Sequence, residues 1–288
     1  MNAEHQWTAE TARITVRGLD DPVRLLHLTD VHCTFIDERD AEHLDRFTDK
    51  HRKMLTQRLH DPFEALLSQV ADIKPDVLVL SGDIIHFPSY ANIEYLRARL
   101  NDVNVPTIFT CGNHDWQFPA EARSETVRTT WWPRLDSLTG GQPSHTAREI
   151  KGLLVIALDN STYQVSREQL EFIRTELAQG LPTVVVMHIP LSQSALRVPT
   201  IKVWGSPILM ADPDWDVVGR KAWDAGHDKP ETVACADLLR NTPNVLAILS
   251  GHIHFDHAEP FSATGVQYVG RPPFTDLGHR VIDLVPQD

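Results

Sequence analysis

The chain alternates short apolar runs with longer stretches in which apolar residues recur at helical spacing. Six short runs are rich in leucine and β-branched residues; they cover residues 24–30, 76–82, 105–111, 152–159, 182–188 and 244–251. Most of them lack regularly alternating polar positions, which is typical of strands that are covered on both faces. Strands that alternate with helices predict an α/β core.

The stretches between the runs contain two well-marked helices and two long excursions. Residues 61–75 have apolar positions at helical spacing and a proline near each end, and 166–180 opens with a Ser-x-x-Gln capping box and closes on glycine. The excursions are 33–60 and 190–240. Within the first, the charged run 37–53 predicts a solvated helix with ion pairs. A place at the edge of a binding site is the alternative for that run.

Polar residues with metal-binding or catalytic chemistry follow five of the six runs. They are Asp30 and His32, Asp83, the consecutive Asn113, His114 and Asp115, His188, and the pair His252 and His254. In α/β sheets the carboxyl ends of the strands converge on the binding crevice. We therefore expect these five strand endings to meet at one place, although they span more than 220 residues of sequence.

The donor set is that of a metal cluster. The same two-residue spacing separates the members of two pairs, Asp30 with His32 and His252 with His254. In extended backbone such pairs point to the same face and can aim two ligands at one cluster. Oxygen and imidazole donors without cysteine favour Mn, Fe or Zn. Seven of the groups are counted here as ligands: Asp30, His32, Asp83, Asn113, His188, His252 and His254. Seven ligands are too many for one tetrahedral ion and fit two ions about 3.5–4 Å apart, bridged by a carboxylate and a hydroxide.

Composition and charge narrow the context of this site. The chain has 288 residues, of which 42% are hydrophobic and 23% charged, as in ordinary soluble proteins. No apolar run approaches the ~20 residues of a membrane helix, and the polar, acidic opening is unlike a signal peptide. Three cysteines suit a reducing compartment, so we expect a cytoplasmic protein. The net charge of −12 disfavours nonspecific binding to nucleic acid or to an acidic membrane surface. The oligomeric state stays open.

The motifs Asp-x-His, Gly-Asp, Gly-Asn-His-Asp, a lone His after a strand and Gly-His-x-His occur in this order. Together they resemble the calcineurin-like metallophosphoesterase superfamily over roughly residues 24–258. The resemblance implies an α/β fold, a four-layer α/β/β/α sandwich of two mixed β-sheets flanked by helices, with a dinuclear metal site at the carboxyl ends of the strands. We expect a single domain over residues 1–288 with a Trp-containing, lid-like insertion at about 191–240.

The resemblance also implies roles for the strand-end residues around two divalent or trivalent transition metal ions. One metal is expected on Asp30, His32 and His254, the other on Asn113, His188 and His252, with Asp83 as the bridge. His114 is expected beside the metals as the catalytic imidazole, with Asp115 orienting it. A turn cap is the alternative role for Asp115.

One position departs from a known subfamily. In purple acid phosphatases a tyrosine three residues after the bridging aspartate binds ferric iron, and here that place holds His86. A purple enzyme is therefore not expected. An additional ligand, a donor to a ligand and a structural role are all open for His86. His257 is expected either to reach substrate phosphate or to lie in a solvated loop.

The closest subfamily pattern is that of the bacterial class III cyclic-nucleotide phosphodiesterases. The first hypothesis is a metal-dependent phosphodiesterase acting on a small organic phosphodiester: a bridging hydroxide attacks phosphorus, and His114 protonates the leaving oxygen. The alternatives are a phosphomonoesterase, acting on nucleotides or proteins, and a non-catalytic scaffold. Trp204, Trp215 and Trp223 either stack on the substrate from a lid or fill a satellite core. No arginine cluster marks a second phosphate site.

Overall fold

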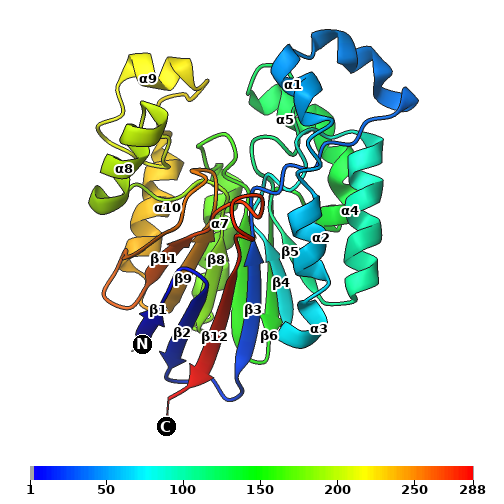
Figure 1. The fold of residues 1–288 in the computed structure, drawn as a ribbon. Coiled ribbons are helices and arrows are strands. Elements are labelled where there is room, and N and C mark those ends of the chain that lie inside the picture. Colours follow the sequence, from blue (N-terminus) through cyan, green and yellow to red (C-terminus); the bar gives the residue numbers. More distant parts are fainter. Residues whose placement is uncertain (1–2, 288) are drawn as a thin grey trace.

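Two mixed β-sheets form the centre of the computed structural model, which describes residues 3–287 (Figure 1). The first sheet has, in spatial order, β1 (Ala3–Trp7), β2 (Thr11–Val16), β12 (Arg280–Pro286), β3 (Val23–Leu28), β4 (Val77–Leu80) and β5 (Thr107–Phe109). The second has β10 (His257–Pro260), β11 (Val266–Val269), β9 (Val245–Ser250), β8 (Thr183–Val186), β7 (Leu153–Leu158) and β6 (His145–Ile150).

The six predicted strands are all present and lie next to one another in the two sheets. β3, β4 and β5 pair in parallel, as do β7, β8 and β9. Successive residues of a strand point to opposite faces, so Val77 and Val79 pack between the sheets whereas Leu78 and Leu80 pack under helices. Because both faces are covered, these strands need no polar alternation, and the expectation from the sequence is confirmed.

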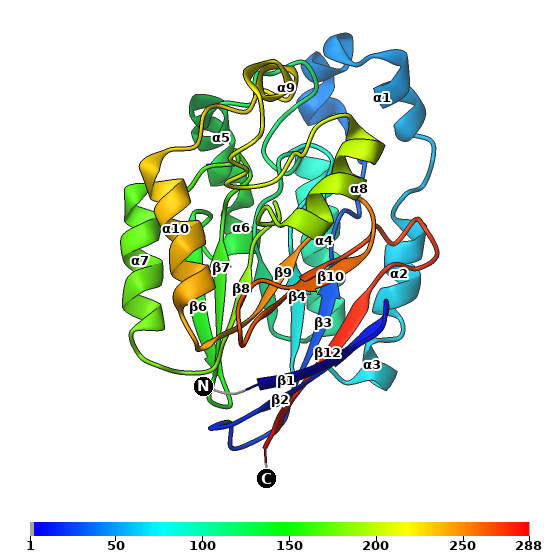
Figure 2. The ribbon, with the colours of Figure 1, turned by 90° about the vertical axis from the view of Figure 1, so that its left-hand side faces the viewer.

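Helices cover the outer face of each sheet and complete four layers (Figures 1 and 2). The helical layer that packs on the first sheet contains α2 (Asp61–Leu67), α3 (Val70–Ile73), α4 (Tyr90–Val103), α5 (Glu125–Trp131), the 3-10 turn Trp132–Leu135 and α6 (Asp136–Thr139). The second sheet is covered by α7 (Arg167–Leu177) and α10 (Pro230–Asn241). The predicted α/β/β/α sandwich is therefore confirmed.

The helix boundaries differ from the sequence expectation in two places. The predicted helix 61–75 is divided into α2 and α3, because the side chains of Ser68 and Gln69 both bond to the carbonyl of Ala65 and compete with the helical ladder. The predicted helix 37–53 is divided at Phe47, which is buried beside Phe87 and separates a 3-10 helix (Glu38–Arg46) from α1 (Asp49–Met54).

Helix α7 follows the expectation closely. Its capping box forms between Ser166 and Gln169, as predicted. No helix within residues 3–287 is both long and apolar enough to cross a membrane.

Two groups of short helices stand above the carboxyl ends of the central strands. Figure 1 shows α1 and α5 on one side, and α8 (Ser194–Trp204) and α9 (Val217–Ala222) on the other. The loops that follow β3, β4, β5, β8 and β9 all lie between these groups. This edge of the sandwich is where the predicted site residues should meet.

Candidate metal centre

The structure brings the predicted ligands together at this edge. The ligand atoms of Asp30, His32 and His254 all lie within 4.8 Å of one another, and those of Asp30, Asp83 and His188 form a second such group. Asp30 belongs to both groups, so the two sets are adjacent. The chain thus gathers residues from four strand endings around a space of the size that metal ions require.

The first group has a contact that favours a cation between its members. Nε2 of His254 lies 3.2 Å from Nε2 of His32 and 3.3 Å from Oδ1 of Asp30. Two lone pairs cannot face each other at such a distance, so in the metal-free protein one of the two nitrogens carries a hydrogen, which a bound cation would replace. Imidazole and carboxylate are common ligands of Mn, Fe and Zn.

The second group leaves buried donor atoms without partners. The Nδ1–H of His188 donates to the carbonyl of Ser81 over 2.9 Å, which directs Nε2 toward Oδ2 of Asp83 at 3.3 Å. Among the described residues, Nε2 of His188 and Oδ1 of Asn113 have no hydrogen-bond partner although both are buried. Such atoms are rare in folded proteins, and a bound cation would satisfy both. The residues present therefore fit a metal centre.

His252 reaches the same place with a partner that sequence reasoning missed. Its Nε2 lies 3.0 Å from the hydroxyl of Tyr163, which leaves Nδ1 free to bind a metal. Its backbone N–H donates to Oδ2 of Asp30 over 3.0 Å. Tyr163 lies in the loop after β7, far from every recognisable motif, so no sequence signal pointed to it.

The backbone at the centre is unusual and corrects one expectation. Five of the predicted ligands have positive φ: Asp30 (54°), His32 (53°), Asp83 (54°), His252 (71°) and His254 (61°). The two-residue pairs therefore do not lie on extended backbone, as the spacing argument assumed. Positive φ is unfavourable for residues other than glycine, and a concentration of it at one site points to function.

Close approaches between loops explain the glycines of two motifs. A Cβ on Gly112 would overlap the carboxylate of Asp83, and one on Gly251 would overlap Thr29 and the Asp30 carboxylate. Only glycine lets these loops pack directly on the two predicted carboxylate ligands.

Charge pairing dominates the titration of the metal-free centre. Burial opposes protonation of His188, but the nearby Asp83 outweighs it and raises the pKa of His188 to about 9. Burial likewise favours the neutral form of Asp30, yet His254 lowers the pKa of Asp30 to about 2. Without metal, protons on histidine thus hold the carboxylates together. Metal ions would have to displace those protons.

His114 lines the cavity and also belongs to a third candidate group, because its ligand atom and those of His32 and His86 lie within 4.8 Å of one another. Its ring stacks on His86 with centroids 4.3 Å apart and meets His32 edge-on at 5.0 Å. Among the described residues its side chain makes no hydrogen bond, whereas its backbone N–H donates to Oδ1 of Asp83 over 2.8 Å. Burial lowers the pKa of His114 to about 3. The free ring is therefore neutral at pH 7.

The structure does not show the expected contact between Asp115 and His114. The buried Asp115 carboxyl group accepts three backbone N–H groups instead: those of Asp83 (2.7 Å), Ile85 (3.0 Å) and Gly112 (2.6 Å). Burial and the neighbouring Asp83 raise the pKa of Asp115 to about 8. No hydrogen bond joins Asp115 to the His114 ring in the described part of the chain. Asp115 therefore ties the loop after β5 to the loop that carries Asp83.

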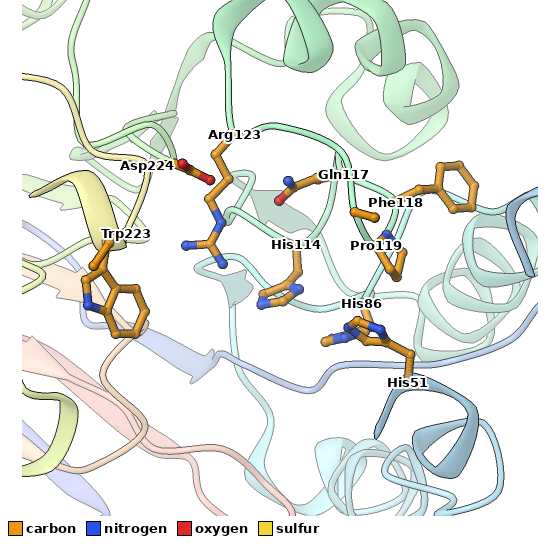
Figure 3. Close-up of a pocket in the computed structure, with 11 residues that line it drawn as sticks. His51, His86, His114, Gln117, Phe118, Pro119, Arg123, Trp223 and Asp224 are labelled. Carbon is orange, nitrogen blue, oxygen red and sulfur yellow. The ribbon is translucent and has the colours of Figure 1, made fainter. Parts of the chain in front are cut away.

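A cavity of about 660 Å³ opens beside the centre. Its lining includes His32, Asp83, Asn113, His252 and His254 of the predicted ligands, and His86, His114, Lys50, His51, Lys53, Arg123, Trp204, Trp223 and Phe274 around them. A smaller lobe of about 360 Å³ shares several of these residues (Figure 3). The charged segment 37–53 thus contributes to the edge of the site through α1, the alternative that the sequence left open.

The surroundings of the three tryptophans and of His257 bear on the alternatives that the sequence left open for them. Trp215 is only 4% exposed and packs edge-on against Tyr163 at 5.1 Å, so it fills the core, whereas Trp204 and Trp223 line the cavity. His257 lies on β10 with Nε2 3.2 Å from Oε1 of Glu259 and does not line the cavity.

Comparison with known sequences gives a family match and distant relatives. The calcineurin-like phosphoesterase profile matches residues 23–256. A Synechococcus protein named "Probable cyclic nucleotide phosphodiesterase" is 26% identical over 200 residues, which cover 66% of this chain and 62% of that protein. The chain thus spans less than two thirds of that relative. A 3′,5′-cyclic adenosine monophosphate phosphodiesterase of Haemophilus influenzae is 22% identical over 81% of this chain and 70% of its own.

Comparison with solved structures shows the fold. A dimetal phosphatase from Danio rerio superposes with a TM-score of 0.59 at 12% identity, covering 91% of this chain and 92% of that one. A purple acid phosphatase from yellow lupin gives 0.53 at 12% identity, over 90% of this chain and 46% of the other. At such identities the likeness concerns the arrangement of sheets and helices alone.

Proposed function

The chain belongs to the calcineurin-like phosphoesterase family, and from this premise we propose that it hydrolyses a small organic phosphodiester in a metal-dependent reaction. The observation that carries the proposal is the buried Oδ1 of Asn113, which has no hydrogen-bond partner among the described residues, beside two groups of ligand atoms, Asp30 with His32 and His254, and Asp30 with Asp83 and His188. The names of the relatives support a diester over a monoester.

The proposed ligand sets follow the geometry and the motifs. One ion would be held by Asp30, His32 and His254, and the other by Asn113, His188 and His252, with Asp83 shared between them. Two such ions, when bound, supply a Lewis acid and a nucleophile at neutral pH. The imidazole-rich donor set favours Mn, Fe or Zn.

His114 is proposed as the general acid. Its ring lies in the cavity and is neutral in the free protein. A bound phosphate ester brings negative charge close to the ring, which favours the imidazolium form and raises its pKa. A ring N–H of His114 can then be donated to the leaving oxygen as the P–O bond breaks. Asp115 acts on the same step only indirectly, by holding the loop that carries His114 against the loop that carries Asp83.

We propose further that the segment of about 191–240 is a lid-like insertion in a single domain. Trp204 and Trp223 support this role because they face the cavity, and Trp215 anchors the segment to the core. A closing lid would exclude water from the reacting ester.

Hydrolysis of paired chromogenic esters tests the function. The protein, loaded with Mn²⁺, should cleave bis(p-nitrophenyl) phosphate with a higher kcat/KM than p-nitrophenyl phosphate. Asp83→Asn, which removes the proposed shared carboxylate, should abolish this activity. Asp72→Asn is its matched control, because Asp72 is exposed on α3, away from the cavity. A clear preference for the monoester would establish a phosphomonoesterase instead. A protein that binds no metal and cleaves neither ester would be a scaffold.

A further inference from the structure

Three cationic side chains surround the cavity beside the metal centre. Lys50 and Lys53 project from α1, and Arg123 comes from the loop between β5 and α5. The carboxylates that line the cavity and its smaller lobe are Asp83, a proposed metal ligand, and Asp224. The whole chain has a net charge of −12, so this local excess of cations runs against its overall composition.

Arg123 differs from three other arginines whose side chains are partly or fully buried. Arg128 pairs with Asp159 at 3.2 Å, Arg134 with Asp40 at 2.6 Å and Arg220 with Asp228 at 2.7 Å. Arg123 is half-buried, yet within residues 3–287 its guanidinium has neither a hydrogen bond nor an ion pair. Figure 3 shows it extending into the space between the rings of Trp223 and His114. Arg123 therefore presents an unused, fork-shaped set of donors to the cavity, which suits a phosphate group.

Two indoles form the wall next to this guanidinium. The rings of Trp204 and Trp223 meet edge-on with centroids 5.8 Å apart. Trp204 is fixed because its Nε1–H donates to the carbonyl of Ile253 over 2.9 Å, and its ring lies 5.6 Å from His254. Such a wall, placed beside the metal centre, offers a surface on which a flat heteroaromatic ring can stack.

A charge balance indicates what the cations recognise. Two divalent ions exceed the charge of Asp30 and Asp83 by two, which a hydroxide nucleophile and a singly charged phosphodiester together neutralise. Among the described residues that line the cavity and its smaller lobe, Arg123, Lys50 and Lys53 are then opposed only by Asp224. A substrate with a single negative charge leaves this excess unmatched, whereas a second phosphate group would match it.

We propose that the preferred substrate carries, besides the scissile phosphodiester, a second phosphate group bound by Arg123 and a heteroaromatic ring stacked against Trp223. The inference rests on the proposed hydrolysis of a phosphodiester. Water adds its hydroxyl to the attacked phosphorus and its proton goes to the leaving oxygen, while the second phosphate is bound and not attacked. Phosphorylated nucleotide esters and nucleoside diphosphate esters have this chemistry, and cyclic mononucleotides do not.

Matched chromogenic esters test this specificity. The reference is the p-nitrophenyl ester of thymidine 5′-monophosphate, which has one negative charge. Two further esters add a second phosphate, one on the 3′ hydroxyl and one within a 5′-diphosphate. The metal-loaded protein should cleave at least one of the two with a kcat/KM about tenfold or more above the reference.

Substitution of Arg123 tests whether its guanidinium recognises the second phosphate or only affects activity in general. Arg123→Gln should reduce the preference for the second phosphate to about threefold or less, and Arg123→Lys should retain part of it. Arg97→Gln is the matched control, because Arg97 is exposed on α4 and lines no part of the cavity. Trp223→Leu should raise KM for all three thymidine esters more than for bis(p-nitrophenyl) phosphate. Metal content and near-UV circular dichroism establish that each variant is folded and loaded.

The outcomes distinguish this inference from the proposed function. Equal kcat/KM for the three thymidine esters, or a preference that survives in Arg123→Gln, would overturn the second-phosphate site while the phosphodiesterase stands. Failure to cleave any diester, bis(p-nitrophenyl) phosphate included, would refute the proposed function itself.

Discussion

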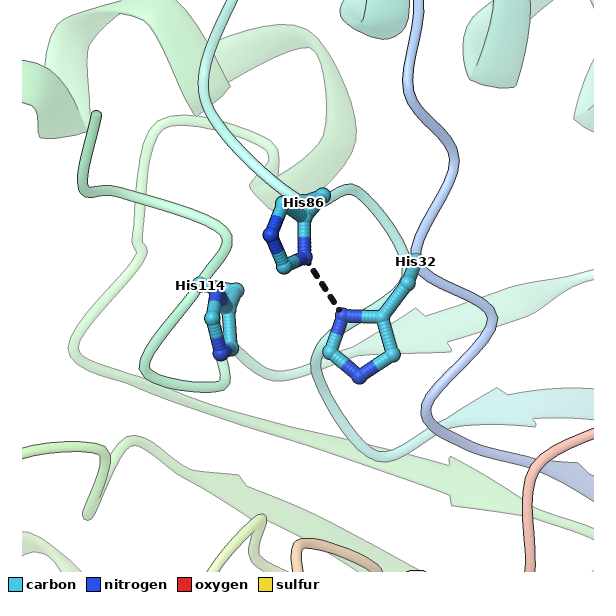
Figure 4. Close-up of side chains that lie close together, drawn as sticks. All are labelled: His32, His86 and His114. Atoms are coloured by element: carbon cyan, nitrogen blue, oxygen red, sulfur yellow. Dashed lines mark hydrogen bonds between the residues drawn. The ribbon is translucent and has the colours of Figure 1, made fainter. Parts of the chain in front are cut away.

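Nδ1 of His86 lies 3.0 Å from Nδ1 of His32 (Figure 4), and this contact leaves Nε2 of His32 directed toward His254 and Asp30. One of the two rings must donate the hydrogen, and a proton on Nδ1 of His32 makes its Nε2 a lone pair. With the hydrogen on His32, His86 accepts it and orients a proposed ligand, while the role of an additional ligand stays a prediction because His32, His86 and His114 form a third candidate group. Partners of this kind fix the tautomer and the angle of metal-binding histidines.

Removal of this partner should weaken one metal site. His86→Phe keeps a ring for packing but removes the hydrogen bond, so affinity for the ion on His32 should fall about 10–100-fold. Titration of the metal-free protein with Zn²⁺ measures the two affinities. His43→Phe is the control, because His43 is also buried and stacks on Phe118 without lining the site. Binding of a third ion that is lost in His86→Phe would show instead that His86 is a ligand, together with His32 and His114.

The protein should lack an intense visible absorption band when it is loaded with iron. The position that holds a ferric-binding tyrosine in purple acid phosphatases is His86 here, so no tyrosinate can donate charge to iron from that place. An absorption spectrum of the Fe³⁺-loaded protein measures this directly. A purple solution that bleaches on reduction would show that another tyrosine, with Tyr163 the first candidate, binds the ion.

Metal affinity should fall as the pH is lowered. A histidine binds metal only when it is neutral, so protons compete below its pKa. Ordinary histidines titrate near 6.5, but Asp83 outweighs burial and raises the pKa of His188 to about 9 in the metal-free protein. Competition at His188 therefore begins at higher pH, and affinity should increase steadily between about pH 6 and pH 9. Isothermal titration with Mn²⁺ at several pH values measures the trend; a constant affinity would contradict a histidine-rich site.

His114 should matter most for poor leaving groups. An alkoxide needs a proton as it departs, whereas nitrophenolate does not, and general acid catalysis typically contributes about 10²–10⁴-fold. His114→Ala should therefore slow hydrolysis of an alkyl or nucleoside diester by about that factor and of bis(p-nitrophenyl) phosphate much less, with metal content near normal. Equal losses on both esters would point to charge stabilisation, and loss of metal would make His114 a ligand.

Asp115→Asn provides a contrast to His114→Ala. Because Asp115 binds the backbone of Asp83, Ile85 and Gly112 and not the His114 ring, its replacement should lower metal content and thermal stability together. The amide nitrogen that replaces one carboxyl oxygen in Asp115→Asn cannot accept a backbone N–H, so at least one of these bonds would be lost. Both esters should then be affected alike, without the leaving-group dependence expected for His114→Ala.

Sequence alone predicted the parts of this molecule that depend on local pattern. The six central strands are apolar because they are buried on both faces, and their endings meet because parallel strands share an edge. What the sequence could not show depends on contacts between distant segments. Tyr163 bonds to His252 from 89 residues away, and Arg123 and Lys50 reach one cavity from a loop and from helix α1.

The local backbone conformation was a second feature that could not be predicted from the sequence. The spacing of Asp30 and His32 predicted that both face one side, but on an extended strand. Their positive φ arises because the loop after β3 is held by backbone hydrogen bonds to the loop after β4, from Asp30 to Gly82 and from His32 to Asp83. Peripheral strands such as β6 escaped notice because edge strands are polar and short of apolar residues.

We propose that two metal ions share Asp83 and that hydrolysis of a phosphodiester depends on both ions. The most direct measurement adds Mn²⁺ to the metal-free protein and follows bound metal and the rate of bis(p-nitrophenyl) phosphate hydrolysis in the same samples, with Asp83→Asn beside the unaltered chain. We expect the rate to rise until about two ions are bound per chain, and we expect Asp83→Asn to lose both ions and the activity because one carboxylate serves two cations. Full two-ion occupancy in Asp83→Asn, or full activity with one ion bound, would contradict this proposal.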